Sequence, residues 1–280
     1  MHLFCFGLGY SATNLADKLL EQGWRVSGTC RTTDKFPKLK TMGITPHIMS
    51  DGLPLENIWD LDSVTHILHS IPPSDGGDIV SNYHLQDLHK LPSLQWFGYL
   101  STTGVYGDQD GGWVDESTHT KPYNPRSERR VEAEKIWLES ELPVHIFRLA
   151  GIYGKGRSAI DALQKGTARR INKPGQLFSR IHVDDIAQII QKSIENPAIG
   201  EMYNCADNMP ASQSDVVGYA AELIGIDPPP LIDFENADLS PMAKSFYAAN
   251  RKVKNDKIKT QLGVDLLYPD YKTGLKSCVL

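Results

Sequence analysis

The sequence lacks several features that would indicate a class of protein directly. It has only four cysteines in 280 residues, and no two of them form a Cys-x-x-Cys pair. This excludes a disulfide framework and argues against structural zinc; we therefore expect no bound metal and a reduced compartment. No apolar run approaches the roughly 20 residues of a spanning helix. We also expect no secretory signal, because no basic segment and apolar leader precede the first glycines.

An excess of positive charge is also missing. The chain has 29 Lys and Arg against 34 Asp and Glu, a net charge of −5. This removes the usual electrostatic reason for binding nucleic acid or an anionic membrane. The 40% of hydrophobic residues argue against disorder. We expect a cytoplasmic protein, a monomer or homodimer, with neither nucleic acid nor membrane as a partner.

The first half of the chain alternates short apolar runs with helical patterns. This alternation is typical of βαβ units and predicts an α/β fold, a Rossmann-type doubly wound parallel sheet with helices on both faces. The predicted strands are His2–Phe6, Trp24–Cys30, Thr45–Ser50, Val64–Ser70, Gln95–Ser101 and Val144–Leu149, and the predicted helices are Ser11–Gln22, Val80–Leu91 and Arg126–Ser140.

The pattern becomes less regular after about Gly154. We expect residues 1–155 to form the Rossmann domain and residues 156–280 a smaller mixed lobe on the substrate side, with residues 182–206 returning to the main sheet. The predicted elements are the helices Arg157–Lys165, Asp185–Glu195 and Ser214–Ile224, the strand Glu201–Cys205 and the polar helical stretches Ser240–Asn250 and Lys254–Leu262.

A glycine turn directly follows the first predicted strand. Gly7-Leu8-Gly9-Tyr10-Ser11-Ala12 matches the Gly-x-Gly-x-x-Gly/Ala pattern and opens a predicted helix. Gly7 permits a tight turn, Gly9 lets a pyrophosphate approach the backbone, and Ala12 lets the helix pack on the strand. Backbone N–H groups at the helix start, from Tyr10 onward, suit the phosphates of a dinucleotide. A tight turn without a ligand is the alternative.

Arg31 directly follows the second predicted strand, about 20 residues after the turn. An Asp or Glu there would accept a hydrogen bond from a free ribose 2′-hydroxyl, and neither is present. The guanidinium of Arg31 suits a 2′-phosphate instead. We therefore expect NADP rather than NAD as cofactor, with a solvated strand-end arginine as the alternative. Topology, together with the family resemblance given below, implies the remaining expected cofactor contacts at the carboxyl ends of later strands, namely Asp51, Ser70, Ile71 and Leu149.

Three further segments carry a resemblance to a known family. They are Tyr99-Leu-Ser-Thr102-Thr-Gly-Val-Tyr-Gly107, Arg148-Leu-Ala-Gly-Ile-Tyr153-Gly154 and Arg180-Ile-His182-Val-Asp184-Asp185. With the glycine turn, they are similar in content and order to segments of the extended short-chain dehydrogenase/reductases. The tail Tyr268–Gly274 resembles an atypical subgroup that is NAD(P)-dependent and epimerase/dehydratase-like. The resemblance covers residues 7–187 and the tail.

That family uses a Ser or Thr and a Tyr-x-x-x-Lys pair. The resemblance implies that Thr102 binds the substrate oxygen; a hydroxyl that satisfies the loop backbone is the alternative. The pair itself is absent, because the family's Tyr position falls on Arg126 and its Lys position on Arg130. Arginine stays protonated and cannot move a proton, although Arg130 suits a ribose hydroxyl.

Another group must therefore carry the proton if the protein is an enzyme. Tyr153 is our candidate; a packing tyrosine is the alternative, as it also is for Tyr106 and Tyr123. The resemblance thus predicts an atypical oxidoreductase acting on a small polar metabolite of sugar or carbonyl type. The second hypothesis is a non-catalytic NADP(H)-binding sensor. We expect the charged run Ser127–Lys135 to be a solvated helix face with an Arg130–Glu134 pair.

Overall fold

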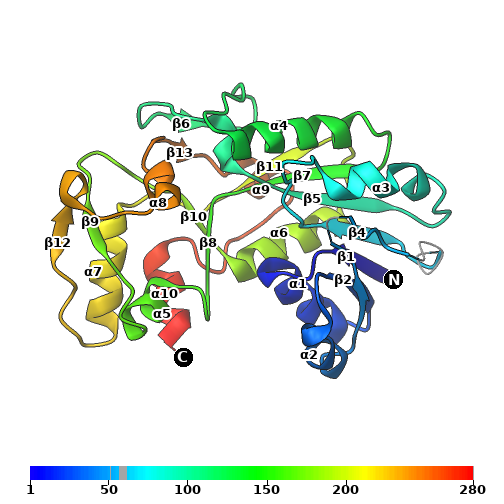
Figure 1. Cartoon of the computed structure of the whole chain (residues 1–280), viewed down its shortest axis with the longest axis horizontal. Helices are drawn as coiled ribbons and strands as arrows, with labels where there is room; N and C mark the ends of the chain where they lie inside the picture. Colours follow the sequence, from blue (N-terminus) through cyan, green and yellow to red (C-terminus); the bar gives the residue numbers. More distant parts are fainter. Residues whose placement is uncertain (51, 57–61, 280) are drawn as a thin grey trace. The chain divides into compact units, whose positions relative to one another are not determined.

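The computed structural model describes residues 1–50, 52–56 and 62–279 (Figure 1). The chain divides into two compact units, each assembled from separate stretches. Unit 1 comprises Met1–Val105, Asn124–Arg148 and Ile186–Tyr203, and unit 2 comprises Tyr106–Tyr123, Leu149–Asp185 and Asn204–Leu280.

A seven-stranded parallel sheet forms the framework of unit 1. The strand order is β11 (Met202–Cys205), β7 (Val144–Leu149), β5 (Trp96–Thr102), β4 (His66–His69), β1 (His2–Phe6), β2 (Arg25–Cys30) and β3 (Ile44–Ile48). The order reverses between β1 and β4, which pair in parallel through Leu3 and His66. The predicted doubly wound parallel sheet is therefore confirmed, and this reversal is where such sheets place their ligands.

Helices cover both faces of this sheet. In Figure 1, α3 and α4 lie on one face, and α1, α2 and α6 on the other. Their bounds are α1 (Tyr10–Glu21), α2 (Phe36–Thr41), α3 (Ile79–Leu88), α4 (Pro125–Leu138) and α6 (Val183–Glu195). The short helix α2 is not among the predicted elements. Its six residues, with Leu39 the buried one, give too little apolar periodicity for recognition from sequence.

Unit 2 consists of short strands and five helices among the described residues. Its two-stranded sheets pair β8 (Gly151–Tyr153) with β10 (Arg180–His182), β9 (Arg170–Asn172) with β12 (Leu231–Asp233), and β6 (Trp113–Val114) with β13 (Lys252–Val253). The helices are α5 (Ala159–Gln164), α7 (Gln213–Leu223), α8 (Pro241–Phe246), α9 (Asp256–Thr260) and α10 (Tyr271–Val279).

Asp185 fastens the segment that leads into α10. Its carboxylate accepts hydrogen bonds from the backbone N–H groups of Leu267, at 2.7 Å, and Tyr268, at 3.2 Å. Asp185 lies in the first turn of α6, and its carboxylate holds a segment more than 80 residues away in the sequence. The ring of Tyr268 packs on His182, with centroids 4.0 Å apart.

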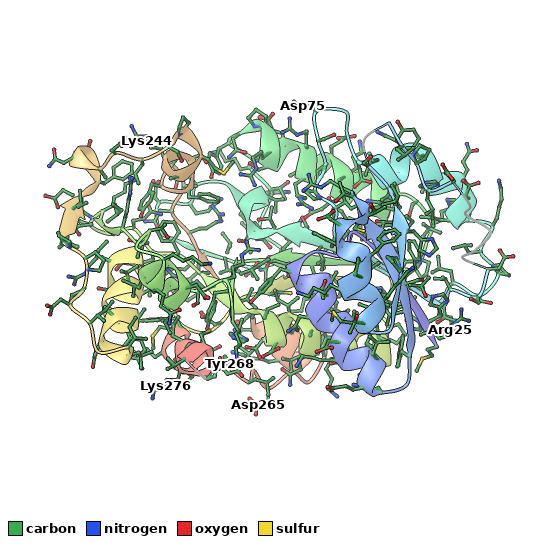
Figure 2. The ribbon with its side chains drawn as sticks, turned by 60° about the horizontal axis from the view of Figure 1, so that its bottom comes forward. Arg25, Asp75, Lys244, Asp265, Tyr268 and Lys276 are labelled. Carbon is green, nitrogen blue, oxygen red and sulfur yellow. The ribbon has the colours of Figure 1, made fainter. Side chains whose placement is uncertain are left out.

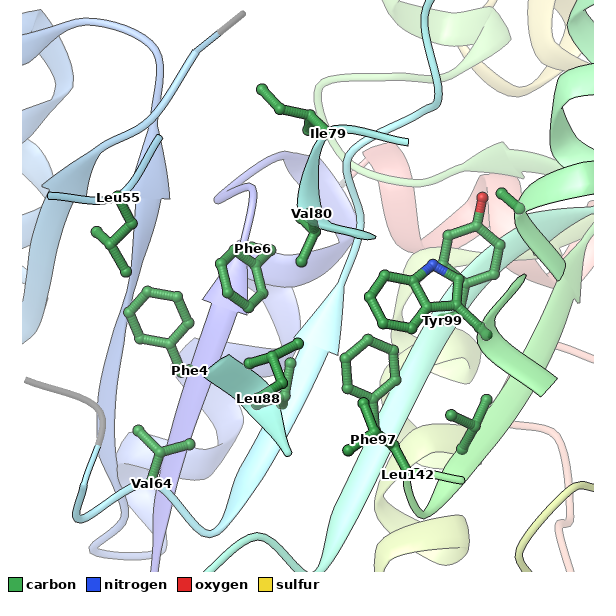
Figure 3. Packing of buried hydrophobic residues seen from close by; sticks show 14 of the residues in the cluster. Phe4, Phe6, Leu55, Val64, Ile79, Val80, Leu88, Phe97, Tyr99 and Leu142 are labelled. Atoms are coloured by element: carbon green, nitrogen blue, oxygen red, sulfur yellow. The ribbon is translucent and has the colours of Figure 1, made fainter. Parts of the chain in front are cut away.

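The core between the sheet and helices α3 and α4 is mainly aromatic and aliphatic (Figure 3). Phe4 and Phe6 of β1 pack edge to face, with centroids 4.9 Å apart. Phe97 of β5 lies against Trp137 of α4 at 4.5 Å. Burying a side chain of this size contributes roughly 1.5–3 kcal/mol. This core fixes β1, and with it the position of the glycine turn that follows.

Candidate functional site: the glycine turn and its surroundings

Gly7 begins the turn in a backbone conformation that other residues rarely adopt. Its φ of +91° lies in the left-handed region. A Cβ at this position would lie 2.8 Å from Cγ1 of Ile71 and 3.0 Å from Oγ of Ser70. The predicted residues Ser70 and Ile71, which follow β4, therefore lie directly against Gly7. Backbone strain and lack of space both require glycine here.

Hydrogen bonds hold the turn between the ends of β2 and β4. The N–H of Gly7 donates to Oγ1 of Thr29 at 2.9 Å, and the N–H of Leu8 donates to the Thr29 carbonyl at 2.7 Å. On the other side, the Ser70 hydroxyl donates to the Gly7 carbonyl at 2.6 Å. Sequence reasoning missed Thr29; its only signal is its place near the end of the second strand.

Gly9 caps the first helix and leaves its N-terminus accessible. A Cβ on Gly9 would meet no described atom within 4 Å, and no described side chain caps α1. The first turn of α1, from Tyr10 through Ser11, contains no acidic residue, and Ala12 is fully buried against the sheet. Backbone N–H groups at such a helix start bind phosphate. The residues present therefore fit a diphosphate.

Arg31 is the first residue after β2, next to this turn. It is exposed and follows β2, two residues after Thr29, which is bonded to the turn. The nearby acid, Asp34, accepts a hydrogen bond from the Thr32 hydroxyl, and this bond lowers the pKa of the Asp34 carboxyl. The predicted contact Asp51 lies outside the described residues. Leu149 is buried at the end of β7 and belongs to unit 2.

Thr102 ends β5, and Arg130 of α4 bonds to the same strand two residues earlier; both belong to unit 1. Oγ1 of Thr102 accepts a hydrogen bond from the N–H of Gly104 at 3.1 Å. Nη1 of Arg130 donates to the carbonyl of Leu100 at 2.7 Å and to the Tyr99 hydroxyl at 3.1 Å. The Thr102 oxygen thus satisfies the backbone N–H of Gly104, and the hydroxyl proton is left to donate.

Beneath this edge lies a buried charged network that the sequence does not reveal. The Ser101 hydroxyl donates to the Glu134 carboxylate. Arg148 binds the same carboxylate through Nε at 3.1 Å and Nη2 at 2.8 Å. The expectation of a solvated face with an Arg130–Glu134 pair is therefore wrong for Glu134. Its partner is on β7, because α4 packs that face on the sheet.

The three tyrosines considered as proton carriers lie in unit 2. Tyr153 is buried and its hydroxyl donates to the Asp270 carbonyl at 3.3 Å; burial raises its pKa. The Tyr106 hydroxyl donates to Asn204 at 2.7 Å, and that of Tyr123 to the Ser245 carbonyl at 3.0 Å. Thr102 and Arg130 belong to unit 1, whereas these hydroxyls all bond within unit 2.

Metal-binding clusters and membrane-spanning helices are both absent from the described residues. These residues contain no group of three or more His, Cys, Asp or Glu side chains that could hold a metal ion. Over the same ranges, each helix is too short or too polar to cross a bilayer.

The chain was compared with known proteins, and no family model matches it. It is 30% identical to protein YeeZ of Escherichia coli K12 over 281 residues, which covers 94% of this chain and 95% of YeeZ. A solved structure of a functionally unknown conserved protein from Silicibacter pomeroyi DSS is 46% identical and covers 99% of this chain and 97% of its own, with a TM-score of 0.91.

A solved dTDP-glucose 4,6-dehydratase from Bacillus anthracis, in complex with NAD, shares the fold. It has a TM-score of 0.80 at 18% identity and covers 100% of this chain and 95% of its own. The glycine turn, the motifs after β5 and β7 and the likeness to YeeZ agree on one assignment. The chain belongs to the extended short-chain dehydrogenase/reductase superfamily, among its NAD(P)-dependent epimerase/dehydratase-like members.

Proposed function

We propose that the protein binds NADP at the glycine turn and is an atypical epimerase/dehydratase-like oxidoreductase for a small polar metabolite of sugar or carbonyl type. In this proposal residues 1–155, with residues 182–206 returning to the main sheet, supply the cofactor domain, and the rest of residues 156–280 the substrate side. The observation that carries it is the turn itself. Gly7 is fixed by backbone conformation and by Ile71, whereas Gly9 has open space at the helix start.

The choice of NADP rests on Arg31. Arg31 is exposed and follows β2, next to the turn. The carboxylate of the nearby Asp34 accepts a hydrogen bond from the Thr32 hydroxyl. A charge-assisted hydrogen bond contributes about 1.5–3 kcal/mol, enough for a preference of tens-fold over NAD. When bound, the nicotinamide would exchange a hydride with the substrate.

Within the chain, Thr102 would donate its hydroxyl proton to the substrate oxygen, since its oxygen already accepts from Gly104. Arg130, fixed to Leu100 and Tyr99, would orient a ribose hydroxyl. Tyr153 is the candidate proton carrier. Burial raises its pKa, which keeps the hydroxyl protonated at neutral pH but also makes it a weaker acid, so the shift counts against fast proton transfer.

The first test is cofactor binding followed by turnover. NADPH fluorescence titrations should give a lower dissociation constant than NADH titrations. Incubation with NADP and a panel of sugar nucleotides should produce a nicotinamide absorbance change or an isomerised or dehydrated product. The first substrate of the panel is dTDP-glucose, because the Bacillus anthracis relative is a dTDP-glucose 4,6-dehydratase. Failure of both nucleotides to bind would refute the proposal.

The second candidate function is an NADP(H) sensor without turnover. The observation that favours it is Arg126, an exposed arginine in the first turn of α4 at the position of the family's tyrosine. A sensor should bind NADP and NADPH with different affinities and leave every substrate unchanged. An enzyme should instead give a nicotinamide absorbance change that depends on the added substrate.

A further inference from the structure

A cavity of about 320 Å³ lies wholly within unit 2. Aliphatic and aromatic side chains of α5, α7, α10 and β8 form the apolar part of its wall, among them Tyr153, Ala162, Val216, Val217, Tyr271 and Leu275. The volume is at the lower end of the range for small-molecule sites, which are usually apolar with a few polar groups that fix orientation. It would hold a compact apolar body.

The polar part of the lining is positively charged. Three arginines, Arg157, Arg169 and Arg180, line the cavity, and no described lining residue is an Asp or Glu. Arg157 and Arg169 are exposed, whereas Arg180 is half-buried. Low-dielectric walls with charge of one sign raise the local concentration of the opposite charge. The lining therefore favours an anion.

Arg180 is held in place by backbone groups rather than by a carboxylate. Its Nη1 donates to the carbonyls of Phe178, at 2.8 Å, and Ala211, at 2.9 Å. Asp207 is the acid whose charge acts on it, yet among the described residues the two form no ion pair. One Asp207 oxygen, Oδ2, is buried without a partner. Burial raises the pKa of Asp207 to about 7. The guanidinium charge is therefore only partly neutralised.

Tyr153 and Tyr271 complete the apolar side. The Tyr153 hydroxyl is directed to the Asp270 carbonyl and packs against Gly274, where a Cβ would clash with the ring. Its ring therefore serves as a wall. The cavity shares no residue with the glycine turn or Arg31.

We propose that this cavity is a second ligand site, which binds a small apolar carboxylate with its carboxylate on Arg180 and its ring or chain against Ala162, Val216 and Tyr271. Two directed hydrogen bonds from a guanidinium suit a planar carboxylate. The apolar walls add affinity in proportion to the surface that they remove from water. This site shares Tyr153 with the proposed function, and its other lining residues have no part in that function.

The test is calorimetric titration of the full-length protein with benzoate as the probe. Benzoate should bind, and the neutral analogue benzamide should bind about tenfold more weakly because it lacks the charge. Ala162→Leu, which fills the cavity, should abolish benzoate binding. Lys165→Ala is the matched control, because it removes a positive charge next to α5 but outside the lining, and it should change affinity less than about twofold.

Thermal melts and NADPH titrations check that each variant is folded. If Ala162→Leu does not fold, Arg169→Ala at the exposed rim takes its place and should weaken benzoate binding about threefold. No binding of benzoate at millimolar concentration, equal binding of benzamide, or benzoate binding that neither cavity variant changes would overturn the proposal. Loss of NADPH binding alone, with benzoate binding intact, would contradict the proposed function and leave this site standing.

Discussion

The guanidinium of Arg148 binds the carboxylate of Glu134 at two points, and both side chains are buried. The pair joins β7 to α4, and the Ser101 hydroxyl adds a third bond to the same carboxylate. A buried pair of this kind adds little net stability over an apolar replacement, but removal of one partner leaves an uncompensated charge. The network therefore ties the end of β5, where Thr102 lies, to the helix that carries Arg130.

Arg148→Met should destabilise the protein by about 3–5 kcal/mol, because the Glu134 charge would remain buried without its partner. Urea denaturation gives the free energy of unfolding. Lys192→Ala is the control: it breaks the exposed Lys192–Glu195 pair and should cost less than about 1 kcal/mol. Equal losses in the two variants would contradict our account. Replacing Glu134 by Leu in the Arg148→Met background should restore part of the stability.

Gly7 and Gly9 should respond differently to the same substitution. Gly7→Ala should destabilise the protein by about 1–3 kcal/mol, because of its positive φ and the contact with Ile71. Gly9→Val should alter stability by less than about 1 kcal/mol, since its Cβ meets no described atom within 4 Å. NADPH affinity should nevertheless fall at least about tenfold in Gly9→Val, because the side chain occupies the space of the diphosphate. Thermal melts and fluorescence titrations separate the two effects.

Arg31→Ala should raise the NADPH dissociation constant by about tenfold or more while leaving NADH binding nearly unchanged. Arg25→Ala is the matched control, since Arg25 is an exposed arginine at the opposite end of β2 (Figure 2). A similar loss for both nucleotides, or a similar effect of the control, would count against a 2′-phosphate contact at Arg31.

Stability should fall on acidification below about pH 6.5, in part because of His66. Burial, with the N-terminal charge as a smaller cause, lowers the pKa of this imidazole to about 4. The unfolded chain, with a histidine pKa near 6.5, binds the proton more readily, and stability therefore declines as pH falls from about 6.5 towards 4. His66 alone should account for about 2 kcal/mol between pH 8 and pH 5.

His66→Phe should reduce this pH dependence while keeping the aromatic packing on Trp24, whose ring centroid is 4.8 Å away. Urea denaturation at pH 8 and pH 5 measures the change. His89→Gln, at an exposed position, is the control and should leave the slope as it is. An unchanged slope in His66→Phe would show that other groups govern acid unfolding.

Much of the fold follows from patterns within single segments. The strand at His2–Phe6 is confirmed residue for residue, and the predicted helix at Arg126–Ser140 corresponds to α4 within two residues. Helix α10 and the three-residue strands β8 and β10 are not among the predicted elements. Such short strands have no period of their own and exist because distant segments pair, as Ile152 does with Ile181.

The same division holds for the site. The glycine turn could be recognised from sequence because a tight turn and an accessible helix start depend on local backbone, which residue type determines. The hydrogen-bond partners of Thr29, Glu134 and Asp185 could not be recognised from sequence, because each bond joins residues far apart in the chain. Only the packed structure decides which charges are buried together, since burial depends on what the rest of the chain places around them.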